Sequence, residues 1–188
     1  MPHFKPFKKL SLLLLFCSII FSAKAAYIFI PMDESQGNHL KAYGIAFYAI
    51  EREIKVDWLL NYKGGSFMIK QHEAIEEECN VRGVSYQLIA DLQSTQILQS
   101  ISSPEVNQDV VRLEKSPKIA IYSPNNKQPW DDAVTMALTY AEIPYEVVYD
   151  EEVLANLLPL YDWLHLHHED FTGQYGKFYA SFKNATWY

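Results

Sequence analysis

The sequence predicts an α/β fold, with a mostly parallel β-sheet and helices on both of its faces. In the second half of the chain, short apolar segments alternate with amphipathic helical segments over short links, a pattern typical of parallel strands with right-handed crossovers. In the first half, a short run rich in β-branched and aromatic residues indicates a buried strand. Hydrophobic residues make up 49% of the chain and charged residues 21%, which excludes a disordered chain or a disulfide scaffold.

The first 25 residues have the pattern of a secretory signal peptide. Lys5, Lys8 and Lys9 precede an apolar run over residues 10–21, and Ala23–Ala25 supplies the small residues of a cleavage site. An uncleaved membrane anchor is the alternative, although the run is short for a span. Cleavage removes four lysines and no acid, so the net charge of −7 becomes −11. We therefore expect an exported protein of the periplasm, the envelope or the medium, with no membrane span after cleavage.

The next part of the chain is predicted as strands and helices in alternation. Apolar residues recur near helical spacing in the first helix, and paired glycines mark a turn. The expected elements, in order, are a strand over 27–31, a helix over 38–52, a strand over 56–62, a turn at Gly64–Gly65, an edge strand over 66–69, a helix over 72–79, a strand over 84–89 and a helix over 95–101 capped by Ser94. A loop over 102–107 follows.

The second half gives the clearer pattern. A strand over 119–122 is followed by a helix that begins near Pro129, with Asp131 and Asp132 at its positive end. Pro144 ends this helix. A strand over 145–149, a helix over 151–158 and a strand over 161–166 complete an arrangement that we expect to be flavodoxin-like.

The last residues predict a helix with an aromatic stripe. Tyr175, Phe178, Tyr179 and Phe182 follow helical spacing and lead directly into Trp187–Tyr188. A parallel sheet of few strands needs further strands beyond it. We therefore expect the fold to be incomplete at its carboxyl end, with an α/β half over 26–113, a second half over 117–188 and a missing carboxyl-terminal half of the same protein.

Charge and motifs exclude several classes of function. An acidic chain is unsuited to nucleic acid, which requires a basic surface. Neither G-x-G-x-x-G nor the P-loop motif is present, and there is no G-x-S-x-G elbow. Cys79 follows Glu76–Glu78, and these negative charges raise a thiol pKa, which disfavours a nucleophile.

Residues 161–170 form the strongest candidate for a site, because they end a predicted parallel strand, where α/β sheets bind ligands. Strand alternation places His165 and His167 on one face, and Glu169 can reach over the strand tip. These three residues are candidates for acid–base catalysis. Two imidazoles and the carboxylate of Asp170 also suit a divalent metal, although no further ligand is identifiable. Packing of His165 beneath a helix is the structural alternative.

A ligand-binding site without a cofactor is the remaining interpretation of this region. His168 and Asp170 follow the strand, and Trp130 stands where a loop enters a helix. An aromatic ring in a loop can stack on a small molecule. We expect these three residues to contact a ligand, with no cofactor and with a divalent metal as the alternative.

Four stretches resemble exported bacterial proteins named asparagine synthetase B. They are residues 27–36, residues 56–62, residues 128–134 and residues 161–175. The resemblance spans the chain that follows the signal peptide, and it implies a class I glutamine amidotransferase-like α/β domain in the later part. It also implies glutamine-dependent amide transfer, that is, asparagine synthesis.

The catalytic residues of asparagine synthetases do not map onto this chain. Pro2 stands where those enzymes carry a nucleophilic cysteine, and residues 63–67 lack the serine and aspartate of their ATP-pyrophosphate loop. We therefore expect a non-catalytic fragment that binds a small molecule or an envelope protein. Amide transfer is one alternative, and a metal-dependent hydrolase that uses His165, His167 and His168 is another.

Overall fold

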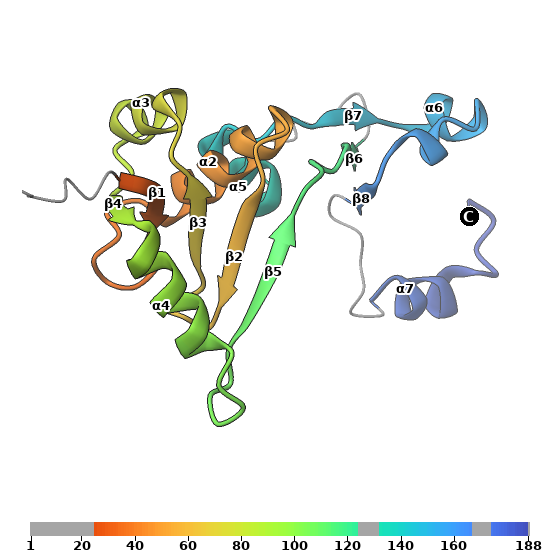
Figure 1. Cartoon of the computed structure of the whole chain (residues 1–188). Coiled ribbons are helices and arrows are strands. Elements are labelled where there is room, and N and C mark those ends of the chain that lie inside the picture. The colour runs from red at the N-terminus through yellow and green to blue at the C-terminus, as the bar shows by residue number, and fades with distance from the viewer. Residues whose placement is uncertain (1–24, 124–131, 167–173, 188) are drawn as a thin grey trace, which may run out of the picture.

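The computed structural model describes residues 25–123, 132–166 and 174–187, and these residues contain two β-sheets (Figure 1). The larger sheet has five strands in the order β4-β1-β3-β2-β5, and the smaller has three in the order β7-β6-β8. The strands are β1 (Ala25–Ile30), β2 (Val56–Leu60), β3 (Ser66–Lys70), β4 (Gln87–Ala90), β5 (Asp109–Leu113), β6 (Ile119–Tyr122), β7 (Glu146–Val148) and β8 (Trp163–Leu166).

Helices connect most of these strands, and two of them have well-defined ends. The Asn38 side chain accepts a hydrogen bond from the Lys41 backbone N–H at the start of α2, and Gly83 closes α3 in the left-handed conformation. The helices are α2 (His39–Glu51), α3 (Glu73–Arg82), α4 (Asp91–Ile101), α5 (Ala133–Ala141), α6 (Asp150–Leu154) and α7 (Gln174–Phe182), with a short 3₁₀ turn over Leu158–Leu160.

The five-stranded sheet is antiparallel, so the prediction of a mostly parallel sheet of the flavodoxin-like or class I glutamine amidotransferase-like type is wrong. Strand β1 pairs antiparallel with β3 and β4, and β2 pairs antiparallel with β3 and β5. Residues 61–65 join β2 to β3, and a connection this short permits a hairpin but no parallel crossover. Strand β3 lies inside the sheet rather than at its edge, and β5 has no counterpart among the predicted elements.

Helices cover both faces of the antiparallel sheet, which explains why its strands resemble parallel ones in sequence. Ile28 and Ile30 pack in a core with α2 and α3, whereas Phe29 packs on the opposite face with Ile101 of α4. A strand buried on both faces shows a continuous apolar run instead of alternation. Such runs are typical of parallel strands in α/β proteins, and here they occur in an antiparallel sheet.

The three-stranded sheet is parallel, which confirms that part of the prediction. Strand β6 pairs in parallel with β7 on one side and with β8 on the other. Ile119 and Ile121 point to the face where α5 packs, because they share a core with Leu138. Tyr122 points to the opposite face, where its hydroxyl donates to the carboxylate of Asp150 at the start of α6.

Helices α2 and α5 join the two sheets. One hydrophobic core includes residues of both halves, among them Ile45 of α2 and Leu138 of α5. The helices approach so closely at Gly44 that a Cβ there would lie 1.9 Å from the Ala141 carbonyl oxygen. At the same contact, Lys41 and Arg82 both form ion pairs with Glu142, the residue that ends α5. The position of β6 and β8 is therefore fixed against the larger sheet.

Candidate functional site

The topology of the smaller sheet defines where a site is expected. The chain forms β6 first, adds β7 on one side through α5, and then adds β8 on the other side through α6. Strand order therefore reverses at β6. In open parallel sheets, ligands bind beyond the carboxyl ends of the strands that flank such a reversal. Here those ends are Tyr122 of β6 and Leu166 of β8.

A histidine and a carboxylate meet at this end of the sheet. His165 lies opposite Ile121 in the β6–β8 register, so its side chain is on the face that α5 covers. Its Nε2 is 2.7 Å from Oδ2 of Asp132, the residue that precedes α5. The His165 side chain is 22% exposed and the Asp132 side chain is 13% exposed. The pair therefore bridges β8 and the start of α5 in a largely desolvated position.

Asp132 also caps α5. Its Oδ1 accepts from the Val134 backbone N–H at 3.3 Å, and its carbonyl accepts from the Thr135 hydroxyl at 2.8 Å. An ionised carboxylate can only accept hydrogen bonds, so Nε2 of His165 carries the proton in this contact. The other ring nitrogen, Nδ1, is then the one that can accept a proton in the neutral imidazole.

A buried hydroxyl follows β6 at the same end of the sheet. The backbone N–H of Ser123 donates to the Val148 carbonyl at 3.0 Å and extends the β6–β7 ladder by one residue. The Ser123 side chain is fully buried, and its Oγ has no hydrogen-bond partner among the residues that the structure describes. A buried hydroxyl without a partner is uncommon, because it loses its hydration without compensation.

The structure brings together only part of the predicted site. His165 is placed at the end of β8, and its partner Asp132 was predicted only as a residue of the helix start. His167, His168, Glu169, Asp170 and Trp130 lie outside the described residues. Two signals in the sequence point to Asp132: its position at a helix start and the location of that start beyond a parallel strand.

The described residues contain no group of three or more His, Cys, Asp or Glu side chains that could hold a metal ion. The proposed set of His165, His167 and Asp170 is not tested by this finding, since two of its members lie outside the described residues. The pair of His165 and Asp132 supplies two groups of the type that binds divalent cations.

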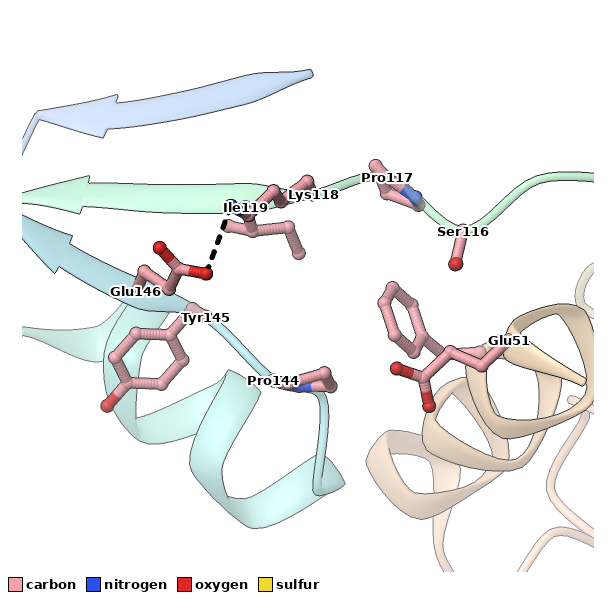
Figure 2. Close-up of a pocket in the computed structure, with 9 residues that line it drawn as sticks. Glu51, Ser116, Pro117, Lys118, Ile119, Pro144, Tyr145 and Glu146 are labelled. Carbon is pink, nitrogen blue, oxygen red and sulfur yellow. Dashed lines mark ion pairs between the residues drawn. The ribbon is translucent and has the colours of Figure 1, made fainter. Parts of the chain in front are cut away.

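A cavity of about 250 Å³ lies at the opposite end of the smaller sheet (Figure 2). The start of β6, the start of β7 and helix α2 surround it. Lys118 and Glu146 form an ion pair of 3.2 Å at this cavity. A hydrogen bond from Tyr161, together with Lys118, holds the pKa of Glu146 below its ordinary value. Lys118 and Glu146 thus neutralise each other, which leaves Glu51 as the remaining charged residue of the cavity lining. The cavity lies at the amino ends of the strands, where ligands seldom bind.

Cys79 lies on the buried face of α3 and is part of the larger core. Burial raises the pKa of its thiol to about 12, and Glu76 and Glu78 add to this rise while Arg82 opposes it. The thiol therefore stays protonated and packs as a small apolar side chain.

Comparisons with known proteins give no relative for this chain. No protein-family model matches it, and neither a curated protein nor a solved structure matches it. Among the helices of the described residues, none has the length and apolar composition needed to cross a membrane. The fold and the pair at the strand ends are therefore the basis for a functional proposal.

Proposed function

We propose that this chain is an exported envelope protein that resembles the front part of proteins named asparagine synthetase B, and that it binds a small polar molecule beyond the carboxyl ends of β6 and β8. The hydrogen bond between His165 and Asp132 carries this proposal, because it lies where the strand order reverses. The buried hydroxyl of Ser123 supports it from the end of β6.

The geometry of the imidazole favours binding over proton transfer. In a catalytic carboxylate–imidazole pair, the carboxylate orients the ring and the exposed nitrogen exchanges a proton with the substrate. Here Asp132 engages Nε2, the nitrogen far from the backbone. The remaining nitrogen, Nδ1, is next to the ring carbon that carries Cβ, so its approach to a substrate is restricted. The pair is better suited to fix the strand end and to present polar groups to a ligand.

The resemblance to exported proteins named asparagine synthetase B suggests the chemical class of the ligand. Molecules with one amide and one carboxylate, such as L-glutamine and L-asparagine, match that class. The proton on Nε2 of His165 is donated to Asp132, so the ring offers Nδ1, which can accept a hydrogen bond from an amide or ammonium N–H of such a molecule. L-Aspartate carries a second carboxylate in place of the amide of L-asparagine, so comparing the binding of these two molecules shows whether the amide is recognised.

Nuclear magnetic resonance of the histidine ring tests this proposal. The purified chain is titrated with L-glutamine, L-asparagine and L-aspartate up to about 10 mM, a range that detects even weak binding. We expect the ring signals of His165 to shift with at least one of the three and to saturate. The His165→Gln variant identifies the signals and should bind at least about tenfold more weakly.

The matched control is His72→Asn, which changes an exposed histidine at the start of α3 and keeps a side chain that can cap the helix. This variant should bind as the unchanged chain does. Ring signals of His165 that stay fixed with all three amino acids would contradict the proposal. Equal binding by the unchanged chain and by His165→Gln would contradict it as well.

The amino terminus of the protein tests export independently. The positive segment, the apolar run and the Ala23–Ala25 site support cleavage after Ala25. Protein isolated from the cell envelope or the medium should begin at Ala26. Recovery of a chain that begins at Met1 from that fraction would overturn the export proposal.

A further inference from the structure

An apolar trough runs along the junction between the two sheets. A cleft of about 440 Å³ opens between α2, β2 and β8, and a second cleft of about 360 Å³ continues it along α5. Tyr43, Ile143 and Trp163 line both clefts. The surface exposed in the larger cleft is entirely apolar, and Trp163 still exposes 42% of its surface. The trough is therefore an open apolar surface on which an apolar side chain from another segment can pack.

Helix α7 carries an aromatic surface of matching character. The rings of Phe178 and Phe182 lie 4.7 Å apart, and the ring of Trp187 lies 5.3 Å from that of Phe182. Phe178, Phe182 and Trp187 nevertheless expose 43%, 39% and 65% of their surface, respectively. Figure 1 shows α7 clear of the larger sheet and of the helices that cover it. The aromatic cluster therefore presents apolar surface outward.

Charge favours contact between α7 and the rest of the molecule. Residues 174–187 contain two lysines, Lys177 and Lys183, and no acidic residue. Residues 26–166 contain 21 acidic and 10 basic residues. A basic, aromatic helix is thus attracted to an acidic body, whereas two acidic bodies repel each other. This charge distribution favours docking through α7 over pairing of the exposed edges of β8.

We propose that two copies of this chain form a reciprocal dimer, in which α7 of each copy docks its aromatic cluster into the trough of the other. The exposed parts of Phe178, Phe182 and Trp187 amount to roughly 300 Å² per helix. The two clefts expose less surface than the helix does, so two such contacts, counted on both partners, bury on the order of 1,000 Å², a size typical of weak and transient interfaces. The dimer is therefore expected to be reversible and dependent on concentration.

Sedimentation equilibrium of the purified chain tests the dimer, with one variant on each side of the contact. Phe182→Asp places a charge in the aromatic cluster, and Trp163→Lys places a positive charge in the trough that faces a basic helix. Each should raise the dimer dissociation constant by about 30-fold, the effect expected for a central aromatic contact. Val81→Asp changes a residue of α3 that is 78% exposed and should shift that constant by less than about twofold.

A mixture of the two variants tests the reciprocal geometry. In a mixed dimer, the unchanged α7 of the Trp163→Lys chain meets the unchanged trough of the Phe182→Asp chain. The mixture should therefore dimerise more strongly than either variant alone. Should Trp163→Lys fail to fold by circular dichroism, Tyr43→Lys replaces it, because Tyr43 lines the same trough and is 41% exposed.

Four results would overturn the proposal. The first is an unchanged chain that stays monomeric at about 100 μM, a concentration at which even weak reciprocal contacts populate a dimer. The second is a Phe182→Asp variant that dimerises as the unchanged chain does, which would locate the interface elsewhere. The third is a mixture of Phe182→Asp and Trp163→Lys that dimerises no more strongly than either variant alone. A monomer that both variants destabilise would indicate that α7 docks in its own trough, and this result also contradicts the dimer.

Discussion

Replacing Gly44 with alanine tests how the two halves of the molecule are joined. Gly44 lies in α2, where a Cβ would be 1.9 Å from the Ala141 carbonyl oxygen and 3.0 Å from its carbonyl carbon. An ordinary contact between a Cβ and a carbonyl oxygen is longer than 1.9 Å by more than 1 Å. The obstacle is the backbone of α5 and not the end of a flexible side chain, so the helices must separate before the methyl group fits.

Two opposing effects set the size of the change. Alanine is favoured over glycine inside a helix by about 1 kcal/mol. Overpacking at a close helix contact costs about 1–3 kcal/mol or more, and it strains the ion pairs that Glu142 forms with Lys41 and Arg82. We expect the packing cost to exceed the helix gain, so that Gly44→Ala lowers the free energy of unfolding by about 1–2 kcal/mol.

Urea unfolding, followed by circular dichroism and tryptophan fluorescence, measures this change. Gly176→Ala is the matched control, because a Cβ at Gly176 of α7 has no atom within 4 Å. The control should leave the free energy of unfolding unchanged or slightly raised, since it keeps only the helix gain. A Gly44→Ala protein at least as stable as the unchanged chain would refute the close contact between α2 and α5.

Three further predictions concern single side chains. Asp132→Ala removes a helix cap and the bond to His165, and should lower the free energy of unfolding in urea by about 1–3 kcal/mol; no loss would contradict both contacts. Native Cys79 should not react with iodoacetamide at about pH 8, because burial raises its thiol pKa to about 12, whereas the unfolded chain should react; rapid native labelling would exclude burial. The pKa of Glu142 is lowered by its bond to Lys41, so its contribution to stability is present above the unfolded pKa and is lost as pH falls through the folded pKa. Thermal unfolding between about pH 5 and pH 3 should therefore depend less on pH in Lys41→Met, and an unchanged slope would contradict this.

Local patterns predicted most of the elements but not the pairing of the larger sheet. The helical spacing over residues 38–52 gave α2 within a residue at each end, and the strand over 119–122 matches β6. Pairing direction depends on contacts between distant segments, which apolar runs do not encode. The turn at Gly64–Gly65 did contain the needed signal, because a hairpin there forces β2 and β3 to be antiparallel.

Competing local hydrogen bonds explain a smaller error. Ser94 was predicted as a helix cap, but α4 begins at Asp91 and the Ser94 hydroxyl donates to the Asp91 carbonyl within the helix. Serine is suited to both roles, and only the tertiary contacts of α4 decide between them. Strand β5 was not predicted, because its half-exposed sequence carries charged residues such as Arg112, which pairs with Asp57 of β2.

Part of the candidate site was accessible from the sequence. The position of His165 near the end of a parallel strand followed from the alternation of strands and helices. Its bond to Asp132 joins residues 33 positions apart, and no spacing rule connects them. The relation becomes apparent only when α5 is placed beside β8, on the face that Ile121 shares with His165.

The protonation of the His165 ring tests the account of the site most directly. Nitrogen-15 chemical shifts of the neutral imidazole identify which ring nitrogen carries the proton. The bond to Asp132 predicts a proton on Nε2 that exchanges slowly with water and exchanges faster in Asp132→Asn. A proton on Nδ1, or an exchange rate that Asp132→Asn leaves unchanged, would contradict the pair on which the proposed binding site depends.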